Sequence, residues 1–204
     1  MKRCTWCNLN NPKYIEYHDY EWGKLNTDEK YLFEMLILES FQAGLSWQCV
    51  LNKREAFKEA YEDFDIDKVI EFDEEKIKQL RNNPNIIRNK LKIKASISNA
   101  KIFKSIQEEY QTFYNYLCTF THGKIIYETG KTTSALSDSI SNDLKKKRHE
   151  VCRKYHYILL SSSHRCDLFS RKRLFLIQRL IPCFPNIWFV AYCRQFAVTH
   201  DWRF

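Results

Sequence analysis

Apolar residues recur at helical spacing through most of the first 120 residues of this 204-residue chain. The clearest pattern places Leu32, Met35 and Leu36 on one helical face, because residues three and four apart are neighbours on a helix. Thr27 precedes an acidic first turn and suits the N-cap, and Gly44 suits the C-terminal end. The pattern therefore predicts one helix between these two residues.

The same periodicity continues downstream and predicts helices over residues 46–64, 66–72, 73–80, 88–108 and 112–120. Pro84 interrupts this series, since the residue before a proline disfavours helical geometry. We find no convincing alternation of period two, which a half-buried strand would show. The sequence thus predicts an all-α fold, with a helical body over residues 1–147.

The net charge of +8 suggests nucleic-acid binding, but the excess of basic residues is unevenly distributed. Residues 148–204 hold ten of the 33 lysines and arginines and only three of the 25 acidic residues. The body is nearly neutral. An argument for DNA binding must therefore depend on where individual basic residues lie.

The four cysteines of the body lack the spacing of a secreted disulfide framework, and the N-terminus shows no signal-peptide pattern. An apolar run at residues 181–193 contains prolines and is too short to cross a membrane. We therefore expect a soluble cytoplasmic protein with no membrane partner.

Residues 1–50 contain the side chains of a pocket for a flat ring. Glu39 follows leucine and isoleucine neighbours on the predicted helix, which favours an inward carboxylate. Trp6, Trp22 and Trp47 offer aromatic faces, and Tyr17 offers a ring with a polar end. Singly, each has an ordinary alternative: a solvent-facing glutamate, core tryptophans or a packed tyrosine. Together they suit an electron-poor aromatic ring.

Cys4 and His18 are metal-capable side chains beside this predicted pocket. Zinc sites in proteins usually have four ligands, so this pair supplies only half of one. The alternative is a surface imidazole that happens to follow Tyr17.

Residues 73–108 fit a helix-hairpin-helix pattern: a short helix, a tight turn and a long helix that begins with basic residues. Backbone N–H groups at such a hairpin can hold a phosphate oxygen, and Arg88, Lys90 and Lys92 would add positive charge. The usual hairpin glycine is absent, and Asn85 is the nearest residue that tolerates a left-handed conformation. The alternative is a turn with a solvated basic face.

These residues together resemble the DNA-3-methyladenine glycosylase I family of the helix-hairpin-helix superfamily. The resemblance covers about residues 3–147 and is carried by Arg3-Cys4-x-Trp6, Tyr17-His18-Asp19-x-Glu21-Trp22-Gly23, Leu38-Glu39-x-x-Gln42-Ala43-Gly44-Leu45-Ser46-Trp47 and Ile86-Ile87-Arg88-Asn89-x-x-Lys92-Ile93. It implies a monofunctional enzyme of base excision repair. Such an enzyme hydrolyses the N-glycosidic bond of 3-methyladenine in alkylated double-stranded DNA and releases the free base.

The resemblance also implies roles for individual residues. Glu39 and Tyr17 would hydrogen-bond the flipped base, Trp47 would stack on it, and Trp6 and Trp22 would wall the pocket. The turn with Gln42, Gly44 and Leu45 would fill the gap left in the duplex, and the hairpin residues Ile87, Arg88, Lys90 and Lys92 would contact the DNA. A structural zinc ion would take Cys4 and His18 as two of its ligands. The protein would be a monomer.

The resemblance ends after Lys147. The family continues with a glycine-containing segment, a buried helix and a His-x-x-x-Cys pair that completes the zinc site, whereas this chain continues with a basic, cysteine-rich tail. We interpret residues 148–204 as translated out of frame after one inserted adenine in the codons of Lys145, Lys146 and Lys147. A shifted translation restores the glycines and the His-x-x-x-Cys pair. The alternative is a divergent natural C-terminus.

The tail would leave zinc without two ligands and the body without one core helix, which we expect to reduce stability and activity. Two other functions remain open at this point. One is an inactive DNA-binding remnant of the family, and the other is a zinc-knuckle interaction module.

Deleting one adenine from the three lysine codons should yield a shorter chain that binds one zinc ion, unfolds at a higher temperature and releases 3-methyladenine faster. Metal analysis, thermal melting and an excision assay check this result. If the shorter chain is no more stable, and the present chain already binds zinc and excises the base at a similar rate, the frameshift interpretation is wrong.

Overall fold

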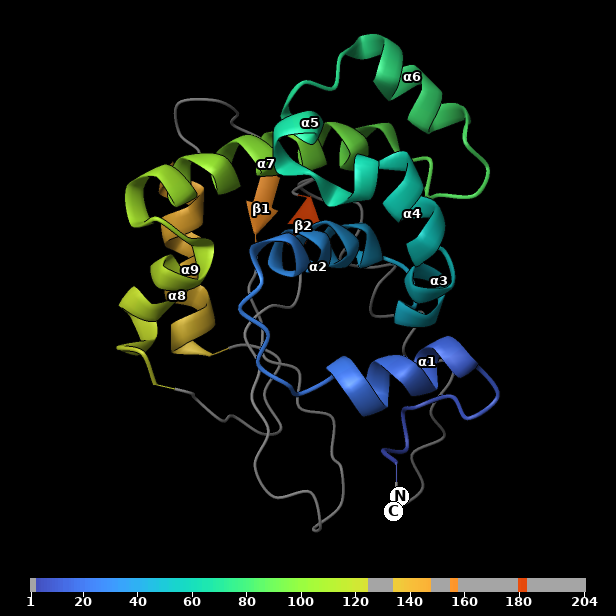
Figure 1. Cartoon of the computed structure of the whole chain (residues 1–204), viewed down its shortest axis with the longest axis horizontal. Helices are drawn as coiled ribbons and strands as arrows, with labels where there is room; N and C mark the ends of the chain where they lie inside the picture. The colour runs from blue at the N-terminus through green and yellow to red at the C-terminus, as the bar shows by residue number, and fades with distance from the viewer. Residues whose placement is uncertain (1–2, 125–133, 148–154, 158–179, 183–204) are drawn as a thin grey trace.

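The computed structural model describes residues 3–124, 134–147, 155–157 and 180–182 (Figure 1). This part of the chain is almost entirely helical, as the sequence predicts. Its helices are α1 (Pro12–Glu16), η1 (Tyr17–Glu21), α2 (Glu29–Gln42), α3 (Trp47–Asn52), α4 (Arg54–Ala60), η2 (Glu62–Phe64), α5 (Ile66–Ile70), α6 (Glu74–Asn82), α7 (Lys90–Tyr110), α8 (Phe113–Thr121) and α9 (Ala135–Lys147).

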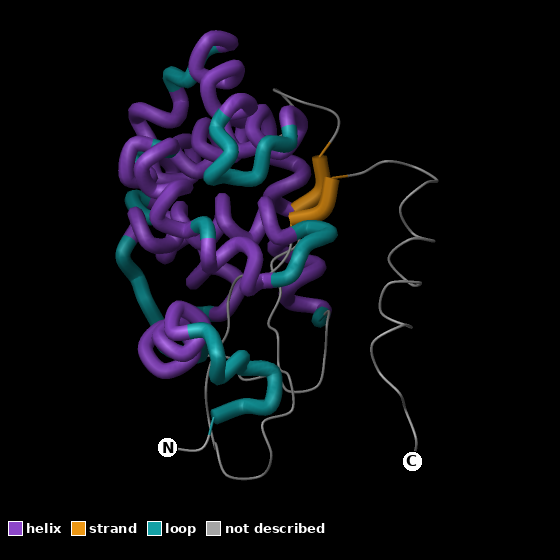
Figure 2. Tube along the Cα trace, turned by 90° about the vertical axis from the view of Figure 1, so that its right-hand side faces the viewer, coloured by secondary structure: helices purple, strands orange, loops and turns teal. Residues whose placement is uncertain are grey.

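Two short strands, β1 (Tyr155–Tyr157) and β2 (Leu180–Pro182), pair antiparallel, with Tyr155 opposite Pro182. Figure 2 shows them at one edge of the helical body. The sequence did not predict these strands. The other residues of 148–204 lie outside the described residues. Most of the segment to which the frameshift interpretation applies is therefore not described.

Several helix boundaries differ from those expected. The N-cap of α2 is Asp28 rather than Thr27, because the Asp28 side chain accepts the Tyr31 N–H at 2.8 Å. The helix predicted over residues 46–64 divides at Lys53 into α3 and α4 and ends in the short helix η2. The short helices α1 and η1 and the helix α9 were not predicted.

Helix α2 lies near the middle of the molecule, with α7 on one side and α1 on the other (Figure 1). Nine consecutive or nearly consecutive side chains, from Leu32 to Phe41, are buried along it. A helix that is apolar all round belongs in a core rather than at a surface. Phe33 meets Phe103 of α7 with ring centroids 5.4 Å apart, so the two helices share one core.

Each end of α2 is tied to another element. At its start, the Glu29 carboxylate accepts the N–H groups of Phe113 and Tyr114 at 2.7 and 3.1 Å, which satisfies the first turn of α8. In its middle, Glu34 accepts two bonds from the Arg54 guanidinium, at 2.7 and 3.1 Å. The same guanidinium donates to Glu21 at 2.6 Å and so fixes η1 against α2 and α4.

The hairpin joins α6 to α7 without a glycine. Asn85 does not take the left-handed conformation expected of it, so that expectation is wrong. Instead, the Asn83 side chain accepts the Asn85 N–H at 2.9 Å and closes the turn locally. Ile86 is buried beneath the turn, and the Asn89 side chain caps α7 by accepting from Leu91 and Lys92. No helix of the described residues is long and apolar enough to cross a membrane.

Candidate active site

Tyr17, Glu39 and Trp47 come together from three elements, as the sequence predicts. The Tyr17 and Trp47 rings meet nearly edge to face, with centroids 5.3 Å apart and planes at 61°. The Glu39 side chain is only 2% exposed, because α2 is buried on every side at this position. Burial raises the pKa of the Tyr17 phenol well above its usual value, and the charge of Glu39 raises it further. The carboxylate therefore lies within electrostatic range of this phenol.

Tyr14 joins the same group, although the sequence analysis did not select it. Burial raises the pKa of its phenol, and the charges of Cys7 and Glu39 contribute in the same direction. Its ring also lies 5.7 Å from that of Trp6. Tyr14 is three residues before Tyr17, at helical spacing, and that spacing was the signal that could have identified it.

Trp6, Trp22 and His18 form a second aromatic cluster next to Tyr14. The centroids of Trp6 and Trp22 are 4.9 Å apart, and the His18 imidazole stacks on Trp22 at 5.6 Å with planes at 13°. The indole N–H groups of Trp6 and Trp47 are buried and donate to no partner among the described residues. A bound ring with an acceptor nitrogen would satisfy such a group.

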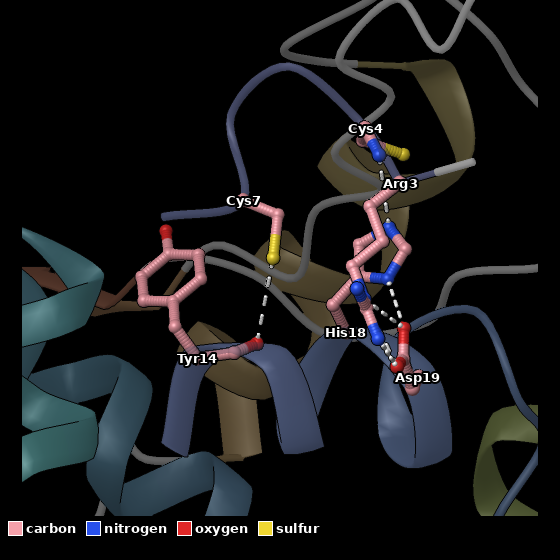
Figure 3. Close-up of polar contacts among 6 residues, drawn as sticks. All are labelled: Arg3, Cys4, Cys7, Tyr14, His18 and Asp19. Atoms are coloured by element: carbon pink, nitrogen blue, oxygen red, sulfur yellow. Dashed lines mark hydrogen bonds and ion pairs between the residues drawn. The ribbon is translucent and has the colours of Figure 1, made fainter. Parts of the chain in front are cut away.

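The backbone of Cys4 lies against the His18 imidazole (Figure 3). The His18 Nδ1–H donates to the Asp19 carboxylate at 2.9 Å, and the Cys4 N–H donates to Nε2 at 3.3 Å. Hydrogen bonds from Arg3 and His18 lower the pKa of Asp19 to about 2, so this carboxylate is ionised at neutral pH. It accepts from the Nδ1–H, and the Nε2 lone pair accepts the backbone N–H of Cys4.

Histidines that bind zinc usually donate their other ring N–H to a carboxylate, as His18 does to Asp19. The fit is nevertheless incomplete. The described residues contain no group of three or more side chains that could hold a metal ion. Zinc binding therefore stays a prediction.

The turn between α2 and α3 exposes an apolar side chain. Gly44 has a φ of +77°, a conformation that favours glycine, and the Leu45 N–H closes the turn by donating to the Gln42 carbonyl at 2.7 Å. Ser46 then caps α3 by accepting the Cys49 N–H at 3.2 Å. Leu45 is 40% exposed as a result. The turn thus presents a leucine to solvent on a short, well-defined loop.

The basic residues of the hairpin divide into two groups. Arg88 and Lys90 are exposed, and Ile87 is half-buried beside them. Lys92 is different, because its ammonium donates to the backbone carbonyls of Phe41 at 2.9 Å and Ala43 at 2.5 Å. The expectation of a phosphate contact by Lys92 needs correction for this reason: the C-terminal carbonyls of α2 occupy its donors. Together, the fold and the site define a helical protein in which tryptophan and tyrosine side chains gather near a buried carboxylate.

Comparison with known proteins identifies the family. The model of the methyladenine glycosylase family matches residues 6–160. The chain is 40% identical over 154 residues to DNA-3-methyladenine glycosylase 1 of Escherichia coli (strain K12), covering 72% of this chain and 81% of that protein. It is 35% identical over 151 residues to DNA-3-methyladenine glycosylase of Haemophilus influenzae, covering 71% and 81%.

The fold agrees with these sequence matches. A solved structure that addresses 3-methyladenine recognition by 3-methyladenine DNA glycosylase I from Staphylococcus aureus aligns with a TM-score of 0.67 at 33% identity. The alignment covers 72% of this chain and 81% of that one. The chain belongs to the methyladenine glycosylase family.

Proposed function

We propose that this protein hydrolyses the N-glycosidic bond of 3-methyladenine in alkylated double-stranded DNA, as the first step of base excision repair. The observation that carries the proposal is the buried Glu39 carboxylate beside the Tyr17 and Trp47 rings. The names of the relatives, and the base recognised by the Staphylococcus aureus protein, support the choice of substrate.

The chemistry of the lesion suits this site. A base in a duplex must leave the stack before an enzyme can reach its glycosidic bond. 3-Methyladenine in DNA carries a positive charge, so it leaves as a neutral base and needs little acid assistance. A tryptophan face attracts a desolvated cation by about 1–2 kcal/mol, and the Glu39 carboxylate adds a direct charge interaction. Both interactions favour the charged lesion over neutral adenine.

We propose that water is the nucleophile and that the reaction is monofunctional. Water adds to C1′ of the sugar and loses a proton, while the bonding electrons of the broken C–N bond neutralise the departing base. In this scheme Glu39 and Tyr17 bind the flipped base, Trp47 stacks on it, and Trp6 and Trp22 wall the pocket. Hydrolysis by water leaves an abasic site without cutting the strand.

For DNA binding, we propose that the turn with Gln42, Gly44 and Leu45 occupies the space vacated by the flipped nucleotide. The exposure of Leu45 supports this role. Arg88, Lys90 and the backbone around Ile87 would contact phosphates, because both side chains are exposed at the start of α7. We do not assign a phosphate to Lys92, since its ammonium is bound to two carbonyls.

Zinc, the cellular compartment and the assembly state belong to the same proposal. Cys4 and His18 would supply two ligands to a structural zinc ion that links the N-terminal segment to ligands elsewhere in the chain. The protein would act in the cytoplasm as a monomer. These three statements follow the family resemblance and are tested separately by metal analysis, cell fractionation and light scattering.

Substituting Glu39→Gln should reduce kcat/KM for 3-methyladenine release from alkylated duplex DNA by roughly 10- to 100-fold, or about 1.5–3 kcal/mol. The amide keeps the shape of the side chain but removes the charge that favours the cationic base. Release of the base, quantified by chromatography, measures the change. The exposed Glu75→Gln on α6 is the matched control and should behave as wild type.

Full excision by Glu39→Gln would remove this carboxylate from its assigned role. If the wild-type protein binds 3-methyladenine but releases none from DNA, it is instead an inactive binding remnant of the family.

Substituting both Arg88→Ala and Lys90→Ala should weaken binding to duplexes of any sequence and lower the slope of log affinity against log salt by about two units. Each lost phosphate contact removes the release of roughly one counterion. Fluorescence anisotropy across a salt series measures the slope, with the exposed Lys101→Ala of α7 as the control. An unchanged slope in the double variant would show that the hairpin does not contact phosphates.

A further inference from the structure

The α2–α3 turn and the hairpin are connected by two lysines that reach in opposite directions. Lys92 follows the hairpin, and its ammonium donates to the carbonyls of Phe41 and Ala43 at the base of the turn, at 2.9 and 2.5 Å. Lys53 lies between α3 and α4, and its ammonium donates to the hairpin carbonyl of Asn85 at 2.9 Å, with a longer contact of 3.3 Å to the carbonyl before it. Each loop is thus held by a lysine from the other side.

The position of Lys92 follows from the end of α2. The last carbonyls of a helix have no partner within the helix and carry partial negative charge, so a cation at this end is stabilising. Burial at this position lowers the pKa of Lys92 from its ordinary value to about 8, while the negative charge of Cys49 as a thiolate on α3 acts in the opposite direction. Among the described groups that influence this ammonium, Cys49 is the titratable one. The charge of Lys92 is therefore sensitive to mildly alkaline conditions.

The turn itself has few other restraints. Its own closing bond is the one from the Leu45 N–H to the Gln42 carbonyl, at 2.7 Å. At Gly44 there is open space around the position of a Cβ atom, so nothing packs against the turn there. Leu45 is exposed rather than packed in the core. The two bonds from Lys92 consequently fix where the turn leaves the helix.

We propose that Lys92 is a positioning residue that holds the α2–α3 turn ready for insertion into the duplex, with Lys53 holding the hairpin in register with it. The proposal rests on the proposed function in that the turn enters DNA. It differs from a phosphate contact, because two of the three Lys92 N–H groups donate to carbonyls of the protein. If both loops are already fixed before binding, the turn loses little conformational entropy when it enters the DNA, and binding is stronger than it would be with a mobile turn.

The proposal separates two binding events. Insertion into a duplex needs the turn, whereas binding of the free base needs Tyr17, Glu39 and Trp47, none of which contacts the Lys92 ammonium in the described hydrogen bonds. Loss of Lys92 should therefore affect DNA and spare the free base. A lysine that only stabilised the fold would affect both.

The test compares Lys92→Met, Lys53→Met and the control Lys101→Met, an exposed lysine on the same helix as Lys92. The first readout is affinity for a duplex that contains a tetrahydrofuran abasic analogue, and the second is affinity for free 3-methyladenine by tryptophan fluorescence. Lys92→Met should weaken duplex binding by about tenfold or more and change free-base binding by less than about twofold. Lys53→Met should weaken duplex binding less, because its donor group is more exposed.

Salt and pH provide the readouts that a structural role would not change. Lys92→Met should keep the wild-type salt slope, since no phosphate contact is lost. Wild-type duplex binding should decline between about pH 7.5 and 9, as Lys92 loses its proton, and the decline should be absent in Lys92→Met. Free-base binding should show no difference between the two proteins over this range.

Three results would overturn the proposal: unchanged duplex affinity in Lys92→Met, a salt slope lower by about one unit, or equal losses for duplex and free base. Unchanged duplex affinity would show that Lys92 does not position the turn. A lower salt slope would show that Lys92 contacts a phosphate. Equal losses would show that the substitution affects the fold as a whole. Because the abasic duplex requires no catalysis, the test stands even if wild-type protein fails to excise 3-methyladenine. That failure would count against the proposed function alone.

Discussion

The burial of the Glu39 carboxylate is the physical constraint on which the site depends. Glu39 is 2% exposed on a helix whose other buried positions are almost all apolar. Removing an ionised carboxylate from water costs several kcal/mol unless the surroundings compensate. A protein that only needed stability would place a leucine there. Tyr14 and Tyr17 lie within electrostatic range of this carboxylate, and Trp47 packs against Tyr17, so the proposed binding site for a cationic ring is built around a negative charge.

Polar contacts away from Glu39 hold helix α2 and its neighbours in position. Arg54 joins η1 to α2 and α4, and so fixes the segment that carries Tyr17. Glu29 caps α8 from the first turn of α2. Lys92 holds the other end of the same helix. The helix that carries Glu39 is thus anchored at its start, its middle and its end, which suits a site that must hold a flipped base in one geometry.

Much of this could be predicted from the sequence, because periodicity and motif spacing report on local structure. The apolar pattern around Leu32 and Met35 predicted α2, and the neighbours of Glu39 indicated an inward carboxylate. Contacts between distant segments could not be predicted, since a lysine on a helix has the same local pattern whether it faces solvent or another helix. Lys92 was assigned to DNA for that reason.

The hairpin shows the same limit at short range. Asn85 was expected to replace glycine through its own conformation, whereas the structure closes the turn through the side chain of Asn83. The frameshift interpretation of residues 148–204 stays a prediction, because few of these residues are among those described. Tyr17, Glu39 and Trp47 themselves lie in the helical body, outside this segment.

The central claim is that Glu39 and the aromatic side chains around it recognise a methylated purine. Titration of the protein with free 3-methyladenine and with adenine, followed by tryptophan fluorescence, tests it directly because Trp47 borders the site. The account predicts saturable quenching by 3-methyladenine and an affinity for adenine at least about tenfold weaker, a difference of about 1.4 kcal/mol. Equal affinities for the two bases, or no quenching by 3-methyladenine, would contradict it.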